Sequence, residues 1–135
     1  MQRFIDAQKL MYDQALGEIK AGRKYDHWIW FIFPQMKGLG RSPNSHYFGI
    51  RGLEEAKEYY AHPVLGASLK EVTQELLKHD KSAEEIFGWL DAKKVCSCMT
   101  LFLEATGDEM FRQVLDKFYK GRLDPATLRL LESDY

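Results

Sequence analysis

The chain has 135 residues, of which 45% are hydrophobic and 29% charged; this is typical of one globular domain and excludes an intrinsically disordered chain. Its 19 basic and 20 acidic side chains give a net charge of −1, whereas proteins that bind a nucleic-acid polymer carry a basic excess or a basic stripe. The longest apolar run, residues 28–33, is far shorter than the roughly 20 residues that cross a bilayer, so we expect no membrane partner.

The first predicted element is a helix over residues 3–20, where apolar side chains recur at intervals of three and four. Gly22 lies where a helix-ending glycine is expected. The periodicity is then lost until residue 52. Within this irregular segment, residues 28–33 are of β-prone types, but a lone strand has no partner in this chain. We therefore interpret them as a short buried helix or an extended segment that ends at Pro34.

Helical patterns return at residue 53 and continue to the end of the chain. They predict helices over residues 53–60, 65–79, 82–88, 91–106 and 108–118, and a last helix that opens at Asp124-Pro125. Ser82 and Glu85 have the spacing of a capping box, and Asp108 can cap the helix after Gly107. The sequence thus predicts a single all-α domain over residues 1–135. We expect a compact multihelical array of about five to seven helices, with an irregular aromatic-rich segment after the first.

The two cysteines, Cys96 and Cys98, have neither metal-site nor redox-motif spacing and are interpreted as free thiols of a reducing compartment. The N-terminal residues show no apolar signal-peptide stretch, so we expect a cytoplasmic protein. The four histidines, at positions 27, 46, 62 and 79, are scattered, and no dinucleotide or phosphate-loop motif is complete. We therefore expect no metal and no cofactor.

Two strings carry a resemblance to a known family: His27–Gln35, which reads HWIWFIFPQ, and Gly38–Ser42, which reads GLGRS. With HPVLG at residues 62–66, they make the chain resemble the family catalogued as domain of unknown function 1810, which some bacterial genomes mislabel as calpastatin. The similarity extends over nearly the whole chain. It implies an all-helical array in the bacterial cytosol, and it implies no activity.

The irregular segment also holds most of the candidate site residues. His27 could act as a general base or acid, since histidine exchanges protons near neutral pH, or it could cap the aromatic segment. Trp28 has a rigid face suited to stacking on a nucleobase, or it packs in the core. Gln35 could orient a ligand through its amide, or satisfy the backbone of the glycine turn that follows.

The remaining candidates are polar side chains that could surround an anion. Gln8 and Tyr12 lie four residues apart on the first helix and so share a face. Lys24 and Arg41 could pair with a negative charge or remain solvated. Ser42 follows two glycines, as in half of a phosphate cradle, or it caps a helix that starts near Asn44.

Two functions fit these residues. The first is a pocket that binds or hydrolyses a small anionic ligand resembling a nucleotide or ADP-ribose, with His27 as the catalytic base. The second is a non-catalytic module that binds another protein or a second copy of the chain. Whether the protein is an enzyme stays open. The first function requires the predicted side chains to converge on one cavity: Gln8, Tyr12, Lys24, His27, Gln35 and Ser42.

Overall fold

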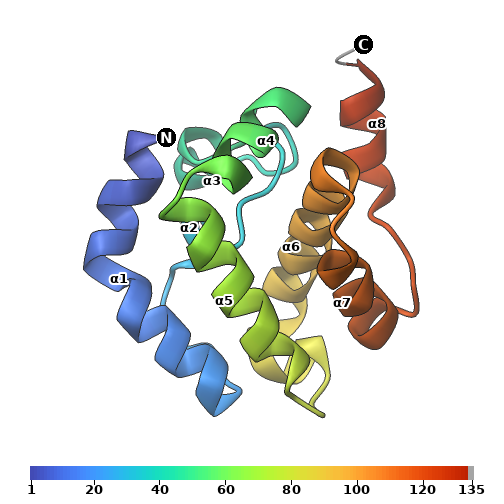
Figure 1. The fold of residues 1–135 in the computed structure, drawn as a ribbon. Helices are drawn as coiled ribbons and strands as arrows, with labels where there is room; N and C mark the ends of the chain where they lie inside the picture. The colour runs from blue at the N-terminus through green and yellow to red at the C-terminus, as the bar shows by residue number, and fades with distance from the viewer. Residues whose placement is uncertain (134–135) are drawn as a thin grey trace.

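The computed structural model describes residues 1–133, and within them the chain forms eight helices and no strand (Figure 1). The helices are α1 (Gln2–Ala21), α2 (Ile29–Ile32), α3 (Pro43–Tyr47), α4 (Leu53–Ala61), α5 (Leu65–Leu77), α6 (Ala83–Thr106), α7 (Glu109–Tyr119) and α8 (Pro125–Ser133). The all-α prediction is confirmed. The predicted number, five to seven, is slightly too low because α2 and α3 are single turns, too short to produce a periodic pattern. None of the helices in this part of the chain is long and apolar enough to cross a membrane.

The helices pack around α5 and α6. Helix α1 lies against α5 and α2, while α4 contacts both α5 and α6. Helices α7 and α8 also pack on α6, and α7 contacts α5 as well; in Figure 1 both lie to the right of α5. The core between the helices is rich in aromatic side chains, and among them Trp28, Tyr59 and Phe102 are fully buried.

The helices end largely where their capping residues predict. Gly22 has a φ of 79° and closes α1. Backbone amides at this end of the helix donate to the carbonyls of Glu18 and Ile19. Ser82 and Glu85 form the expected capping box at the start of α6. Asp108 caps α7 by accepting a hydrogen bond from the amide of Met110.

The aromatic segment after α1 forms a short buried helix. Ile29, Phe31 and Ile32 of α2 are buried, and Phe33, which follows them, is fully buried. An isolated parallel bridge then ties the segment to residue 50: the Lys37 amide donates to the Ile50 carbonyl at 2.7 Å, and the Ile50 amide donates to Gln35 at 2.9 Å. The single turn is therefore held by tertiary contacts, since an isolated helix of this length is unstable in water.

Helix α6 is bent at Gly88. The sequence predicts two helices here, over residues 82–88 and 91–106. The structure confirms two helical stretches that meet at a kink: Gly88, with φ 78° and ψ 161°, is non-helical, and α6 denotes the two stretches together. The bend turns the next two side chains outward, so Trp89 is 62% exposed and Leu90 is 59% exposed.

Both cysteines are free thiols, as predicted. Cys98 is buried and Cys96 is half-buried. Burial raises the pKa of Cys96 to about 11 and raises that of Cys98 well above its ordinary range, so both are protonated at neutral pH.

The backbone at Gly88 generates a stability prediction. A Cβ on Gly88 would meet no atom within 4 Å, so Gly88→Ala adds no clash. Its φ and ψ are nevertheless confined to glycine, and we expect Gly88→Ala to lower the free energy of unfolding by about 1–3 kcal/mol. Urea unfolding followed by tryptophan fluorescence measures the change.

Gly17→Ala is the matched control. Gly17 lies inside α1 and also has open space at its Cβ position, but its backbone is helical. Alanine should there raise the free energy of unfolding by about 0.5–1 kcal/mol. Equal effects of the two substitutions would contradict the argument from backbone strain.

Candidate functional site

The loop after α1, helix α2 and the bend of α6 meet around one shallow pocket of about 350 Å³. The loop contributes Lys24 and His27, α2 contributes Trp30, and the remaining lining residues come from one stretch of α6. We call this cavity the lysine pocket; the α6 residues that line it are Phe87, Gly88, Trp89, Leu90, Asp91 and Lys94.

The carboxylate of Glu18, in the last turns of α1, fixes the path of the loop. It accepts hydrogen bonds from the backbone amides of Tyr25 and Asp26 at 2.6 and 3.1 Å and from the indole nitrogen of Trp28 at 3.0 Å. Partial burial alone would raise the pKa of Glu18, but these donors favour the charged form and hold it at about 2. These hydrogen bonds hold the loop in place at the positions from which the Lys24 and His27 side chains extend.

Two lysines share one carboxylate in the lysine pocket. Lys24 Nζ lies 2.8 Å from Asp91 Oδ2, and Lys94 Nζ lies 3.0 Å from Asp91 Oδ1. The Lys24 side chain is 8% exposed, and its backbone amide donates to the Ile86 carbonyl at 2.7 Å. Partial burial opposes the charge on Asp91, but the two ammonium groups outweigh it and lower the pKa of Asp91. The three groups together carry a net charge of +1.

Trp30 supplies an aromatic wall and an unused hydrogen-bond donor. The side chain is half-buried, and Lys94 Nζ lies 4.9 Å from the centre of its ring. The indole nitrogen of Trp30 is buried and has no acceptor among residues 1–133. An unsatisfied buried donor costs about 1–3 kcal/mol, so an acceptor brought to it would be favoured.

His27 is exposed at the edge of the lysine pocket. The neighbouring carboxylate, Asp26, is hydrogen-bonded to Gln14 of α1. Lys24 and His27 are therefore the two predicted site residues that the structure brings to a common cavity.

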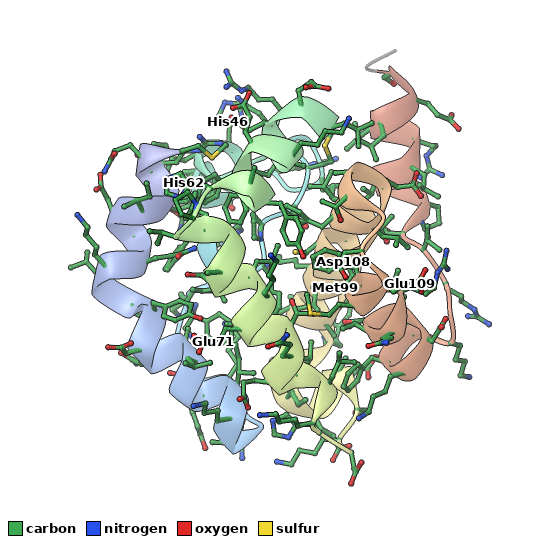
Figure 2. The ribbon with its side chains drawn as sticks, in the orientation of Figure 1. His46, His62, Glu71, Met99, Asp108 and Glu109 are labelled. Atoms are coloured by element: carbon green, nitrogen blue, oxygen red, sulfur yellow. The ribbon has the colours of Figure 1, made fainter. Side chains whose placement is uncertain are left out.

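Three other predicted residues form contacts between elements of the array, where Gln8 and Trp28 are buried and Tyr12 is half-buried. Gln8 is buried and donates from Nε2 to the Phe31 carbonyl at 2.8 Å and to the Tyr59 hydroxyl at 3.1 Å. Trp28 is fully buried, with its indole nitrogen on Glu18. The Tyr12 hydroxyl donates to Glu71 at 2.5 Å, and Figure 2 shows Glu71 between α1 and α5. These side chains connect elements of the core and do not line the lysine pocket.

The last three predicted residues lie on the segment that leads to α3. Gln35 is buried, Arg41 is exposed, and the Ser42 hydroxyl accepts a hydrogen bond from the Ser45 amide and so caps α3. The alternative interpretation of Ser42, a helix cap, is thus confirmed. The predicted side chains do not converge on one cavity, because Ser42 and Tyr12 are engaged in separate structural contacts. The pocket that the sequence predicts from these six residues is therefore not formed within residues 1–133, and the lysine pocket is a different cavity that contains Lys24 and His27 of that set.

Sequence reasoning missed Asp91 and Lys94 and assigned Trp30 to the core. Asp91 and Lys94 are spaced as an ordinary ion pair on a helix, and nothing in their local sequence marks them as neighbours of Lys24. Trp30 does stand in the segment that the sequence singled out. Which of the two tryptophans is fully buried depends on which indole nitrogen finds an acceptor, and that acceptor, Glu18, comes from another helix.

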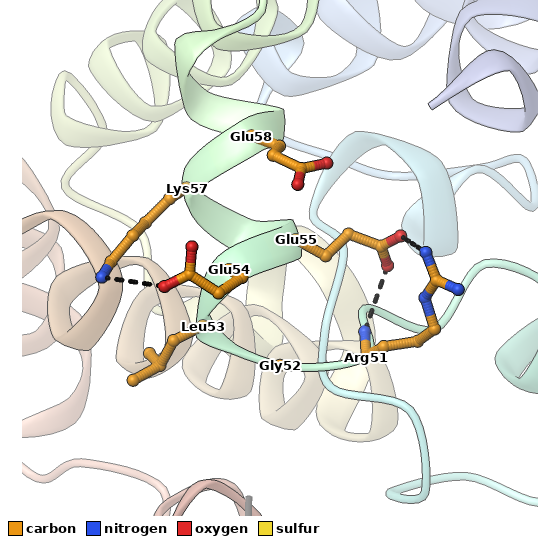
Figure 3. A pocket seen from close by; sticks show the side chains of 7 residues that line it. All are labelled: Arg51, Gly52, Leu53, Glu54, Glu55, Lys57 and Glu58. Carbon is orange, nitrogen blue, oxygen red and sulfur yellow. Dashed lines mark hydrogen bonds and ion pairs between the residues drawn. The ribbon is translucent and has the colours of Figure 1, made fainter.

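A second cavity, of about 560 Å³, lies beside the start of α4 (Figure 3). Its charged groups mostly neutralise one another. Arg51 donates to Glu55 from both its backbone and its guanidinium, and Lys57 pairs with Glu54. Arg3 also contacts Glu55, at 3.0 Å, so the cluster links α1 to α4. These ion pairs give the cluster a structural role, because they connect α1 to α4.

His79 does not line the lysine pocket and hydrogen-bonds to the Ile19 carbonyl at 2.5 Å, while the other two histidines, His46 and His62, lie farther away. His62 accepts hydrogen bonds from the amides of Val64 and Leu65 through Nδ1 and so caps the turn before α5. Figure 2 shows His46 and His62 near α3 and α4, at the opposite end of the molecule from the start of α6. Within residues 1–133 no three His, Cys, Asp or Glu side chains are grouped so that they could hold a metal ion.

Comparisons with known proteins give a family and a fold. A family model described as "Protein of unknown function (DUF1810)" matches residues 1–131. The conserved hypothetical protein Rv1873 from Mycobacterium tuberculosis, known from a crystal structure, is 45% identical to this chain with a TM-score of 0.95. The match covers 97% of this chain and 95% of that protein. No curated protein matches the chain.

The environment of Glu18 generates a pH prediction. Glu18→Gln should lower the free energy of unfolding at pH 7 by about 1–2 kcal/mol, because hydrogen bonds to a charged acceptor are lost at a partly exposed site. The folded-state pKa, about 2, lies below the ordinary value of 4.5. The stabilisation is therefore fully present above about pH 4.5 and is lost as the pH falls towards 2. The difference between wild type and variant should shrink over that window in urea unfolding.

Asp13→Asn is the control for this measurement, since Asp13 is an exposed carboxylate on the same helix. It should leave the stability nearly unchanged. A wild-type to Glu18→Gln difference that stays constant between pH 7 and pH 2.5 would refute the role given to the carboxylate.

Proposed function

The chain belongs to the DUF1810 family, and because that family is described only as being of unknown function, we propose from the site alone that the protein binds a small anionic ligand in the lysine pocket. The ligand class is a phosphorylated, ring-bearing compound such as a nucleotide or ADP-ribose. The membership was predicted from the HWIWFIFPQ and GLGRS strings and is confirmed over residues 1–131.

The observation that carries the proposal is the sharing of Asp91 by Lys24 and Lys94. A surface ion pair ordinarily has one positive and one negative group, so its net charge is zero. Here two ammonium groups face one carboxylate. A phosphate group that approached these lysines would meet a net positive charge in a partly desolvated site, where charge-assisted hydrogen bonds are strongest. Lys24 suits this role because its side chain is nearly buried and its position is fixed by the Ile86 carbonyl.

The walls of the lysine pocket favour a ligand that also carries a ring. Trp30 and Trp89 both line it, and Trp89 is largely exposed. Indole faces stack on nucleobases with little dependence on base identity. The volume of about 350 Å³ is at the lower end of the range for small-molecule sites, and it suits a mononucleotide-sized group.

His27 supports a further, hydrolytic role for the same pocket. It is the imidazole among the lining residues, and it lies beside the groups that would hold the anion. An imidazole in this place can act as a general base on a water molecule. Asp26 does not orient its ring, because that carboxylate bonds to Gln14, so we assign binding first and hydrolysis second.

Isothermal titration of the full chain with ADP-ribose, AMP, adenosine and inorganic phosphate tests the binding. We expect saturable binding of ADP-ribose or AMP, and at least tenfold weaker binding of adenosine and of phosphate. Lys94→Met keeps an apolar stem over Trp30 and removes the charge, and it should weaken the binding about tenfold.

Lys93→Met is the matched control, because Lys93 is the next residue on α6 and does not line the lysine pocket. It should leave the affinity for AMP unchanged. The proposal fails if none of the four compounds binds, or if the two lysine variants weaken the binding equally. For hydrolysis, His27→Ala should abolish turnover of a bound ligand while its affinity changes less than twofold.

A further inference from the structure

A cavity larger than the lysine pocket lies on the other side of the α6 bend, where α6 meets the end of α7 and the turn before α8. It has a volume of about 800 Å³. We call it the α6–α7 groove. Its lining includes three large apolar and three basic residues: Trp89, Phe118 and Leu123, and Lys93, Lys120 and Arg122.

The floor of the α6–α7 groove is held in place by contacts between helices. The Tyr119 hydroxyl donates to the Ala92 carbonyl at 2.5 Å, which joins the end of α7 to α6. The Cys96 thiol donates to the Arg122 carbonyl at 3.6 Å, which joins the following turn to the same helix. A partner would therefore meet a surface that is already formed, which lowers the entropy lost on binding.

Large apolar side chains stand in this groove. Trp89 is 62% exposed, and Phe118 and Leu123 are half-buried. Exposed aromatic side chains at the edge of a formed groove are the residue type that dominates protein-binding surfaces.

The rim of the α6–α7 groove is basic. Lys93, Lys120 and Arg122 are exposed, and Lys93 Nζ lies 4.6 Å from the centre of the Trp89 ring. The lining also holds two acidic residues: Asp124, which accepts hydrogen bonds from Ser97 and Thr127, and the exposed Glu84. The three cations outnumber these two carboxylates, on a chain whose net charge is −1.

Lys120 holds its place on the rim at an energetic cost. It is the only residue other than glycine with a positive φ in residues 1–133, at φ 57° and ψ 32°, and it forms the left-handed end of α7. Glycine or asparagine is the usual residue at such a position. A lysine there keeps a cation at the edge of the groove in a conformation that lysine disfavours, and strain of this kind gathers at functional sites.

We propose that the α6–α7 groove binds an acidic segment of a partner protein, with aromatic or aliphatic side chains seated between Trp89, Phe118 and Leu123. Its carboxylates pair with Lys93, Lys120 and Arg122 on the rim. Charge complementarity selects this occupant: the groove is open, apolar at its floor and basic at its edge. A linear acidic peptide with apolar anchors satisfies both parts at once.

The test is a selection of 12-residue peptides from a random display library on the full chain, followed by fluorescence anisotropy of the selected peptides. We expect them to carry a net negative charge and at least one Trp, Phe or Leu. Their affinity should fall as salt is raised from 50 to 300 mM, because the rim charges are screened. Lys93→Glu should weaken the binding at least tenfold.

Lys120→Gly separates binding from stability. It relieves the left-handed backbone, so the melting temperature should stay the same or rise, while the affinity for the selected peptides should fall at least threefold. Lys9→Glu, an exposed charge reversal on α1, is the control and should not change the affinity.

Three outcomes would overturn the proposal. The first is that the selection yields no peptides, or yields neutral or basic ones. The second is that the Lys93→Glu and Lys120→Gly variants bind the selected peptides as tightly as the wild type does. The third is a dimer in analytical ultracentrifugation that Lys93→Glu dissociates, which would assign the α6–α7 groove to a second copy of the chain.

Discussion

The hydrogen bonds of the Glu18 carboxylate set the path of the chain between α1 and α2. Two backbone amides and the Trp28 indole nitrogen donate to this one carboxylate. Because the acceptor is charged, these hydrogen bonds are strong enough to offset the loss of hydration of the three donors. Trp28 can then be fully buried, because its polar atom has a partner. With Trp28 anchored, Lys24 reaches Asp91 on α6 and His27 is left at the surface. The lysine pocket thus depends on a contact that lies outside it.

The bend at Gly88 has the corresponding role on the opposite wall. A continuous helix would carry residues 89 and 90 on along its own surface, whereas the glycine conformation turns them into solvent. Trp89 consequently stands between two cavities and lines both. Lys93 and Lys94 are neighbours in the sequence, but successive helical positions differ by roughly 100°, so each lysine lines a different cavity. Substitution of Lys94 therefore removes a charge from the lysine pocket alone, and substitution of Lys93 removes one from the α6–α7 groove alone.

The two proposed sites differ in the chemistry that they recognise. The lysine pocket combines a nearly buried cation with a small volume, and these properties suit a compact anion bearing a ring. The α6–α7 groove is larger, and its exposed cations surround the exposed Trp89 and the half-buried Phe118 and Leu123, which suits a peptide. The acidic and basic groups beside α4 pair with each other, and their geometry accounts for cohesion between α1 and α4 without a ligand.

The sequence alone determined the all-α class and most helix ends, because Gly22, the Ser82–Glu85 capping box and Asp108 act through hydrogen bonds within a few residues. It also identified the segment that holds Lys24 and His27. Only the tertiary structure decided which tryptophan is buried, that α2 and α3 are helical turns, and that Lys24 meets Asp91. Each of these depends on a partner far along the chain, whose position is set by packing and leaves no local pattern.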